Sequence, residues 1–193
     1  MKQHDFTGIV PAQYTGKEFE VDATVEIQDE SEAKVFYETV KNRLLNISNW
    51  HHLAGIISAK FQLINSSGEE VDRQVEKGDY FKINIPGPGS SEGDGYDWVG
   101  VEEIKEVIEK DVQSVALRVR PVSNPFGEKK EIAHFYSDEA TSSFIITRQG
   151  KKLTAWIIDR NIKPNDDAGS LTDKIRDIVV GVGAMGLFSK IQW

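Results

Sequence analysis

The chain has 193 residues, of which 39% are apolar and 28% charged, with no cysteine and a formal net charge of −8. That length is typical of one globular domain, and the lack of cysteine excludes disulfide scaffolds, thiolate metal sites and cysteine nucleophiles. No apolar run approaches the length of a membrane span, and the start, MKQHDFTGIVPAQ, contains no segment typical of a signal peptide. We therefore expect a cytoplasmic protein that does not insert into a membrane.

The excess negative charge is confined to the first half of the sequence. Residues 1–97 hold 9 Lys and Arg against 17 Asp and Glu, whereas residues 98–193 hold 14 of each. Binding to a phosphate backbone needs basic residues gathered on one face. The basic residues of the second half are more simply explained as the solvated face of a sheet, so nucleic acid is not expected as a partner.

The first expected elements are a strand and two helices. Residues 18–28 alternate between apolar and polar, which predicts a strand with one buried face. From Ser31 the apolar residues, among them Val35 and Phe36, repeat at helical spacing, with Asp29 or Ser31 as the N-cap. A second, short helix is predicted over residues 48–54.

Alternation with a period of two then continues for about a hundred residues. Residues 102–110 fit either two helical turns or a bulged strand, and pairing with the following strand favours the strand. Residues 86–95, rich in Gly and Pro, are interpreted as a surface loop or a lid over a cavity mouth. A tight hairpin is expected at Gln149-Gly150. The predicted strands are residues 57–63, 71–75, 81–85, 96–101, 112–122, 141–148 and 153–160.

A long C-terminal helix is predicted over residues 171–188. Apolar residues cover more than half of its circumference, which indicates a largely enclosed helix. Gly181, Gly183 and Gly186 interrupt it, and each costs up to about 1 kcal/mol relative to alanine. They either leave room for a ligand or allow close packing of the helix on the sheet. The G-x-G-x-x-G letters at 181–186 lack the following strand of a dinucleotide site, and no metal-ligand spacing occurs, so neither cofactor nor metal is expected.

The order of elements resembles the START-like superfamily, also called SRPBCC, which includes the polyketide cyclases and has the helix-grip fold. The resemblance implies an α+β fold in which a curved antiparallel sheet of about six to eight strands wraps around a long C-terminal helix, with two short helices after the first strand. Residues 1–17 are then an N-terminal extension, and residues 18–193 a single START-like domain. The residues that carry the resemblance are the strand Phe19–Ile27, the helix with Val35-Phe36-Tyr37, the segment Asn46–Leu53, and the ending Leu153–Ile158 with the helix Leu171–Phe188.

In that superfamily, the space between sheet and terminal helix holds apolar molecules. The resemblance therefore implies binding or carriage of a small apolar ligand, with no catalysis assumed. An alternative is a cyclase- or aromatase-like enzyme that uses the same cavity, with His134, Tyr96 or Asp159 as acid or base. Another is a module resembling chaperone regulators, whose acidic first half binds a basic partner protein. The residues expected to line the cavity, the aromatic ones mostly as core, are Trp50, Phe61, Phe81, Trp98, Phe144, Trp156, Gly181, Met185 and Phe188.

Overall fold

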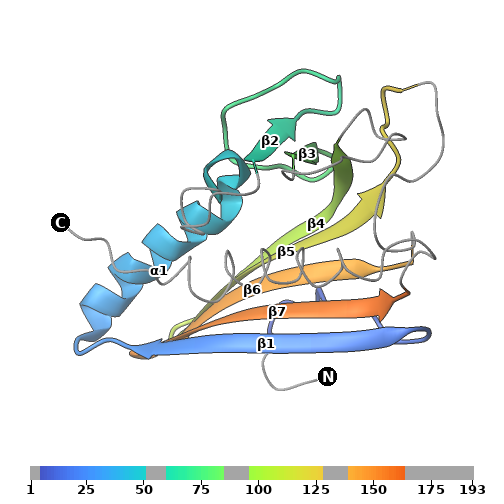
Figure 1. The fold of residues 1–193 in the computed structure, drawn as a ribbon. Coiled ribbons are helices and arrows are strands. Elements are labelled where there is room, and N and C mark those ends of the chain that lie inside the picture. The colour runs from blue at the N-terminus through green and yellow to red at the C-terminus, as the bar shows by residue number, and fades with distance from the viewer. Residues whose placement is uncertain (1–4, 51–59, 85–95, 128–138, 164–193) are drawn as a thin grey trace.

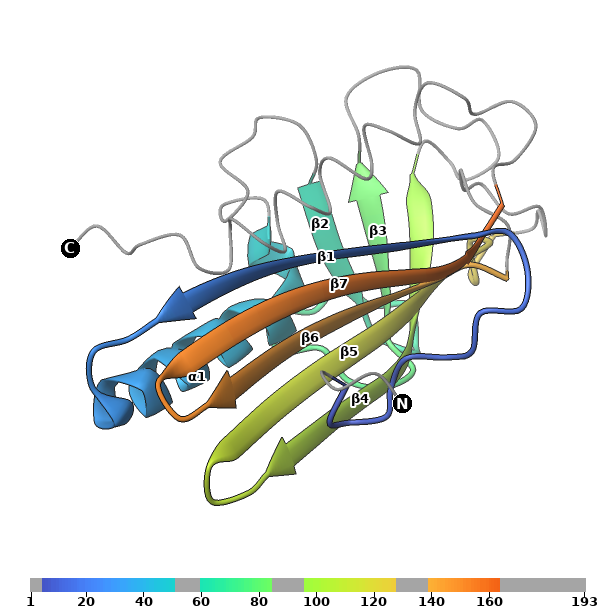
Figure 2. The same cartoon turned by 90° about the horizontal axis from the view of Figure 1, so that it is seen from below.

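The computed structural model of the chain describes residues 5–50, 60–84, 96–127 and 139–163. These residues form an α+β fold in which one antiparallel sheet has the strand order β1-β7-β6-β5-β4-β3-β2 (Figure 1). The sheet is strongly curved, so that β1 and β7 run across β2 and β3 at a steep angle (Figure 2). The strands are β1 (Lys17–Glu26), β2 (Lys60–Ile64), β3 (Tyr80–Asn84), β4 (Asp97–Ile108), β5 (Val112–Val122), β6 (Thr141–Gln149) and β7 (Lys152–Ile162).

The predicted first helix is present as α1 (Glu30–Leu45), which lies across one face of the sheet (Figure 1). Asp29 is its N-cap, because its side chain accepts hydrogen bonds from the backbone N–H groups of Ser31 and Glu32. The expectation that Val35 belongs to the buried stripe is wrong, since its exposed fraction is 69%. The stripe instead consists of Ala33, Tyr37, Val40 and Leu44, and Val35 lies about 100° or more away from it around the helix.

Two further predictions about the strands have clear outcomes. The ambiguous residues 102–110 are strand as far as Ile108, with an irregularity in the pairing between Val101 and Glu103. The predicted strand at residues 71–75 is wrong. That segment leaves the sheet to reach the end of α1, where the Val75 N–H donates to the carbonyl of Leu45 over 2.9 Å.

The predicted short helix at residues 48–54 is seen at its start as the 3₁₀ turn η1 (Ile47–Asn49). Its remainder lies outside the described residues, as do the 86–95 loop and the predicted helix at 171–188. The hairpin between β6 and β7 is confirmed. Gln149 pairs with Lys152, and Gly150 starts the two-residue turn with a φ of 59°, a value that glycine adopts without a steric penalty.

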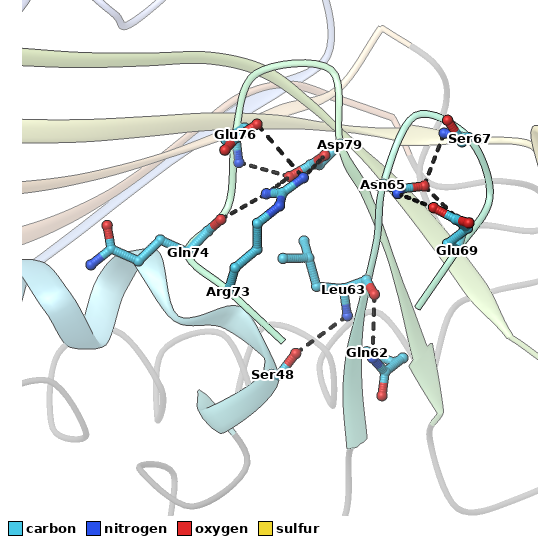
Figure 3. Close-up of polar contacts among 10 residues, drawn as sticks. All are labelled: Ser48, Gln62, Leu63, Asn65, Ser67, Glu69, Arg73, Gln74, Glu76 and Asp79. Atoms are coloured by element: carbon cyan, nitrogen blue, oxygen red, sulfur yellow. Dashed lines mark hydrogen bonds and ion pairs between the residues drawn. The ribbon is translucent and has the colours of Figure 1, made fainter. Parts of the chain in front are cut away.

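Side-chain hydrogen bonds fix the connection between β2 and β3 (Figure 3). Arg73 binds both carboxylate oxygens of Asp79, with Nη1 2.7 Å from Oδ2 and Nη2 2.9 Å from Oδ1. The backbone N–H of Glu76 donates to the same carboxylate over 2.7 Å. At the preceding turn, the Asn65 side-chain oxygen accepts from the backbone of Ser67. The buried Asp79 carboxylate therefore has a full set of donors.

The sheet has two covered faces. On the inner face, on which α1 packs, the buried side chains include Val99, Leu117 and Phe144. On the outer face, Ala116, Ile145 and Ile158 form a smaller cluster with Ile9, which is fully buried. The N-terminal residues 5–10 thus cover part of the outer face.

The N-terminal segment is also held by Asn161, which has a φ of 59° and is 1% exposed. Its side-chain oxygen accepts from the backbone of Tyr14 and Thr15, and its amide donates to the carbonyl of Ala12. We expect Asn161→Ala to lower the free energy of unfolding by about 2 kcal/mol, because these bonds are lost and alanine disfavours the left-handed backbone. Urea unfolding measures the loss.

The matched variant is Asn161→Gly, which also removes the side-chain bonds but tolerates a positive φ. We expect it to be about 1 kcal/mol more stable than Asn161→Ala. Equal losses in the two variants would show that backbone conformation contributes nothing at this position.

Candidate functional site

Four of the predicted site residues lie together on the inner face. The ring of Trp50 is 5.6 Å from that of Phe61, 6.0 Å from that of Phe81 and 5.2 Å from that of Phe144, measured between centroids. All four side chains are at most 5% exposed. The indole N–H of Trp50 donates to the carbonyls of Arg43 and Leu44 at the end of α1. This aromatic cluster connects the end of α1 to β2, β3 and β6 on the inner face of the sheet.

Trp98 and Trp156 lie on the other face. Trp98 follows the inward-facing Asp97 on β4, and its ring is 6.0 Å from that of Phe126. Trp156 packs with the outer cluster that contains Ile9. Because successive side chains of a strand point to opposite faces, neither indole reaches the inner face. The positions of Gly181, Met185, Phe188 and His134 lie outside the described residues.

Asp97, at the start of β4, adds a carboxyl group to the inner face. It pairs with Ile83 of β3, which in turn pairs with Phe61 of β2, so the three side chains form one cross-strand row. Ile83 and Phe61 both belong to the inner apolar cluster. Asp97 is not among the predicted site residues, and it lies beside the aromatic cluster.

The Asp97 carboxyl has no hydrogen-bond donor among the described residues, although it is only 5% exposed. Burial alone raises its pKa from the ordinary 3.8 to about 7. Asp79, which is equally buried, accepts three hydrogen bonds on its two carboxylate oxygens, two from Arg73 and one from the backbone N–H of Glu76. Asp5 accepts from Thr7, and from two backbone N–H groups, and its pKa is lowered. Asp97 therefore differs from these structural aspartates.

The inner face carries other polar groups. Asp159 pairs with Ser142, and it shares the face of Ile157, so it points inward as the sequence suggested. The buried hydroxyl of Tyr37 has no hydrogen-bond partner among the residues that the structure describes, and burial raises its pKa, so it stays neutral. Arg148 is 1% exposed and donates to Gln113. The inner face thus has aspartates towards one end and a paired arginine at the other.

A surface pocket of about 310 Å³ lies over β2 and β3. It is lined partly by Lys82 and Tyr96, and the Lys82 ammonium is 5.0 Å from the centre of the Tyr96 ring. The same ammonium binds Glu70 over 2.6 Å. Lys82 points away from the inner face, since its neighbours Phe81 and Ile83 are inward. Phe61 of the aromatic cluster also lines this pocket, and Lys82 is already paired with Glu70.

Within the described ranges, no group of three or more His, Asp or Glu side chains is arranged to hold a metal ion. The one α-helix in these ranges is too short and too polar to cross a membrane.

The chain is similar to several solved structures. One is a protein from Nitrosospira multiformis, with 8% identity and a TM-score of 0.45 over 85% of this chain and 93% of that one. Another is ginseng major latex-like protein 151 from Panax ginseng, with 18% identity and a TM-score of 0.40 over 86% and 93%. A third is truncated norcoclaurine synthase from Thalictrum flavum, with 11% identity and a TM-score of 0.41 over 89% and 95%.

Each of these likenesses is an overall resemblance at 8 to 18% identity. No family model matches the sequence, and no curated protein matches it at a significant level.

Proposed function

We propose that this chain binds or carries a small, largely apolar molecule on the inner face of its sheet, next to the aromatic cluster. The observation that carries the proposal is the Asp97 carboxyl, which is buried beside Ile83 and Phe61 without a donor among the described residues. A largely buried carboxyl group that receives no hydrogen bond from the described residues is able to accept one from a ligand. Binding of apolar molecules is also what the START-like resemblance implies.

The test is a fluorescence titration with 1-pyrenemethanol, an apolar probe with one hydroxyl group. We expect saturable binding and a rise in melting temperature, because a ligand that binds only the folded chain stabilises it by about 2.7 kcal/mol at a hundred times its Kd. The absence of both effects would overturn the proposal.

A matched pair of variants locates the site. Ser142 is a partly exposed residue of the inner face, so Ser142→Trp should obstruct the probe and weaken its binding at least tenfold. Thr154 is a partly exposed residue of the outer face, one strand away, and Thr154→Trp should leave the affinity unchanged. Equal effects of the two variants would place the probe elsewhere.

A cyclase-like enzyme on the same face is the second candidate, favoured by the inward Asp97 carboxyl. A group with a pKa of about 7 can both accept and donate a proton near neutral pH. Mass spectrometry of a ligand recovered after incubation separates the two functions, since carriage returns the ligand unchanged and catalysis converts it.

A further inference from the structure

Among the described residues, no positively charged side chain lies beside Asp97 on the inner face. Its neighbours there are Ile83 on β3 and Phe61 on β2, and the next inward position of β5 is Pro121, which pairs with Val99. None of these side chains titrates. Burial is the only cause that raises the pKa of Asp97, so no described cation offsets it. Within the described ranges, the negative charge of the Asp97 carboxylate is therefore not balanced by a positive one.

The arginines of the sheet are occupied elsewhere. Arg118 and Arg120 bind Glu102, and Arg118 also donates to the carbonyl of Ile9, which packs on the outer face. Arg148 is on the inner face, but it lies in the row of Gln113, whereas Val99 lies in the row of Pro121. Eight residues of β5 separate these rows, about 25 Å at the rise of a strand.

We propose that the ligand of the inner face is an apolar molecule that carries a protonated amine, and that the Asp97 carboxylate binds this amine. The inference rests on the proposed function and adds to it the chemical class of the ligand. An ammonium group has three donors and a positive charge, so it supplies both the hydrogen-bond donor and the counter-charge that the described residues do not give Asp97. A hydroxyl group supplies one donor and no charge, and a carboxylate ligand would be repelled.

The site also limits where the amine lies within the ligand. Asp97 is in the row of Phe61, and Phe61 contacts Trp50 and Phe81 in the aromatic cluster. An amine at Asp97 therefore places the adjoining apolar body against these rings and Ile83. We expect a primary amine close to an aromatic or aliphatic ring system, because a cation within a larger apolar body would not reach the carboxylate.

Two probes with the same ring system test the proposal at pH 8, where Asp97 is largely ionised. These are 1-aminomethylpyrene, which is a cation, and 1-pyrenemethanol, which is neutral. We expect the amine to bind the unmodified chain at least tenfold more tightly than the alcohol. Asp97→Asn should abolish this preference, so that the amine and the alcohol bind with equal affinity.

The control variant is Asp22→Asn, which removes the same charge from an exposed position on β1. Asp22 lies between the inward Val21 and Ala23, so it points away from the inner face, and the preference for the amine should persist. A loss of preference in both variants would mean that the amine responds to net charge and would overturn the assignment to Asp97.

The pH dependence of the unmodified chain provides a test that needs no variant. The preference for the amine should fall from pH 8 to pH 5.5, as Asp97 takes up a proton while the amine stays charged. A preference that does not change with pH would overturn amine recognition by Asp97. If the alcohol binds and the amine binds no better, the amine inference is wrong and the proposed function stands. If neither probe binds, the proposed function itself fails.

Discussion

Trp50→Ala is expected to lower the free energy of unfolding by about 3 to 5 kcal/mol. Trp50 is 3% exposed and contacts the rings of Phe61, Phe81 and Phe144, so its removal leaves a cavity where α1 meets the sheet. Its indole N–H also donates to two carbonyls at the end of α1, which lose a partner. Urea unfolding followed by circular dichroism measures the change.

Two variants show what this loss consists of. Trp50→Phe keeps a ring in the cluster but removes the donor, and we expect it to cost about 1 to 2 kcal/mol. Tyr14→Ala removes an aromatic side chain that is 67% exposed, and it should change the free energy by less than about 0.5 kcal/mol. A loss below 1 kcal/mol for Trp50→Ala would contradict the role of the aromatic cluster as core.

Much of the sheet could be predicted from local patterns. Apolar and polar residues alternate around β1 and in β5 to β7, because these strands bury one face more completely than the other. Turn residues also mark where some of these strands end. The spacing of apolar residues at 102–108 fits either a helix or a strand, and pairing with β5 makes this segment a strand. Residues 71–75 have the composition of a strand, but the Val71 N–H donates to Leu63 of β2 and the Val75 N–H donates to Leu45 of α1. Local spacing carries no information about that tertiary contact.

Residue type does not decide which face of the sheet a side chain occupies. Trp98 and Trp156 are aromatic like the other predicted site residues, but each is directly next to an inward residue, Val99 or Ile157, and so points to the other face. The same alternation of side chains along β4 places Asp97 on the inner face with Val99 and Val101. The inward position of Asp97 could therefore have been predicted from the sequence. The lack of a donor could not be foreseen, because donors come from strands and loops that are distant in the sequence.

Asp97→Asn is expected to stabilise the chain at pH 8, in contrast to most substitutions of buried residues. The pKa of this carboxyl is raised to about 7 in the folded chain from an ordinary 3.8. The folded state therefore holds a proton that the unfolded state has released, and stability falls as the pH rises from about 4 to 7. Above pH 7 the raised pKa lowers the free energy of unfolding by at most about 4 kcal/mol. The neutral asparagine avoids this cost, and its advantage should disappear near pH 4.

Asp79→Asn is the matched comparison, because Asp79 is as deeply buried but binds Arg73 through both oxygens. Removing this negative charge leaves the guanidinium without its partner, so the variant should be destabilised by about 2 kcal/mol or more at pH 8. Urea unfolding of both variants at pH 8 and pH 4 separates the two cases. If Asp97→Asn were also destabilised at pH 8, the Asp97 carboxylate would have a stabilising role within the chain. That result would contradict the proposal that Asp97 is kept as a carboxylate in order to bind a ligand. A gain in stability on Asp97→Asn is what the proposal predicts.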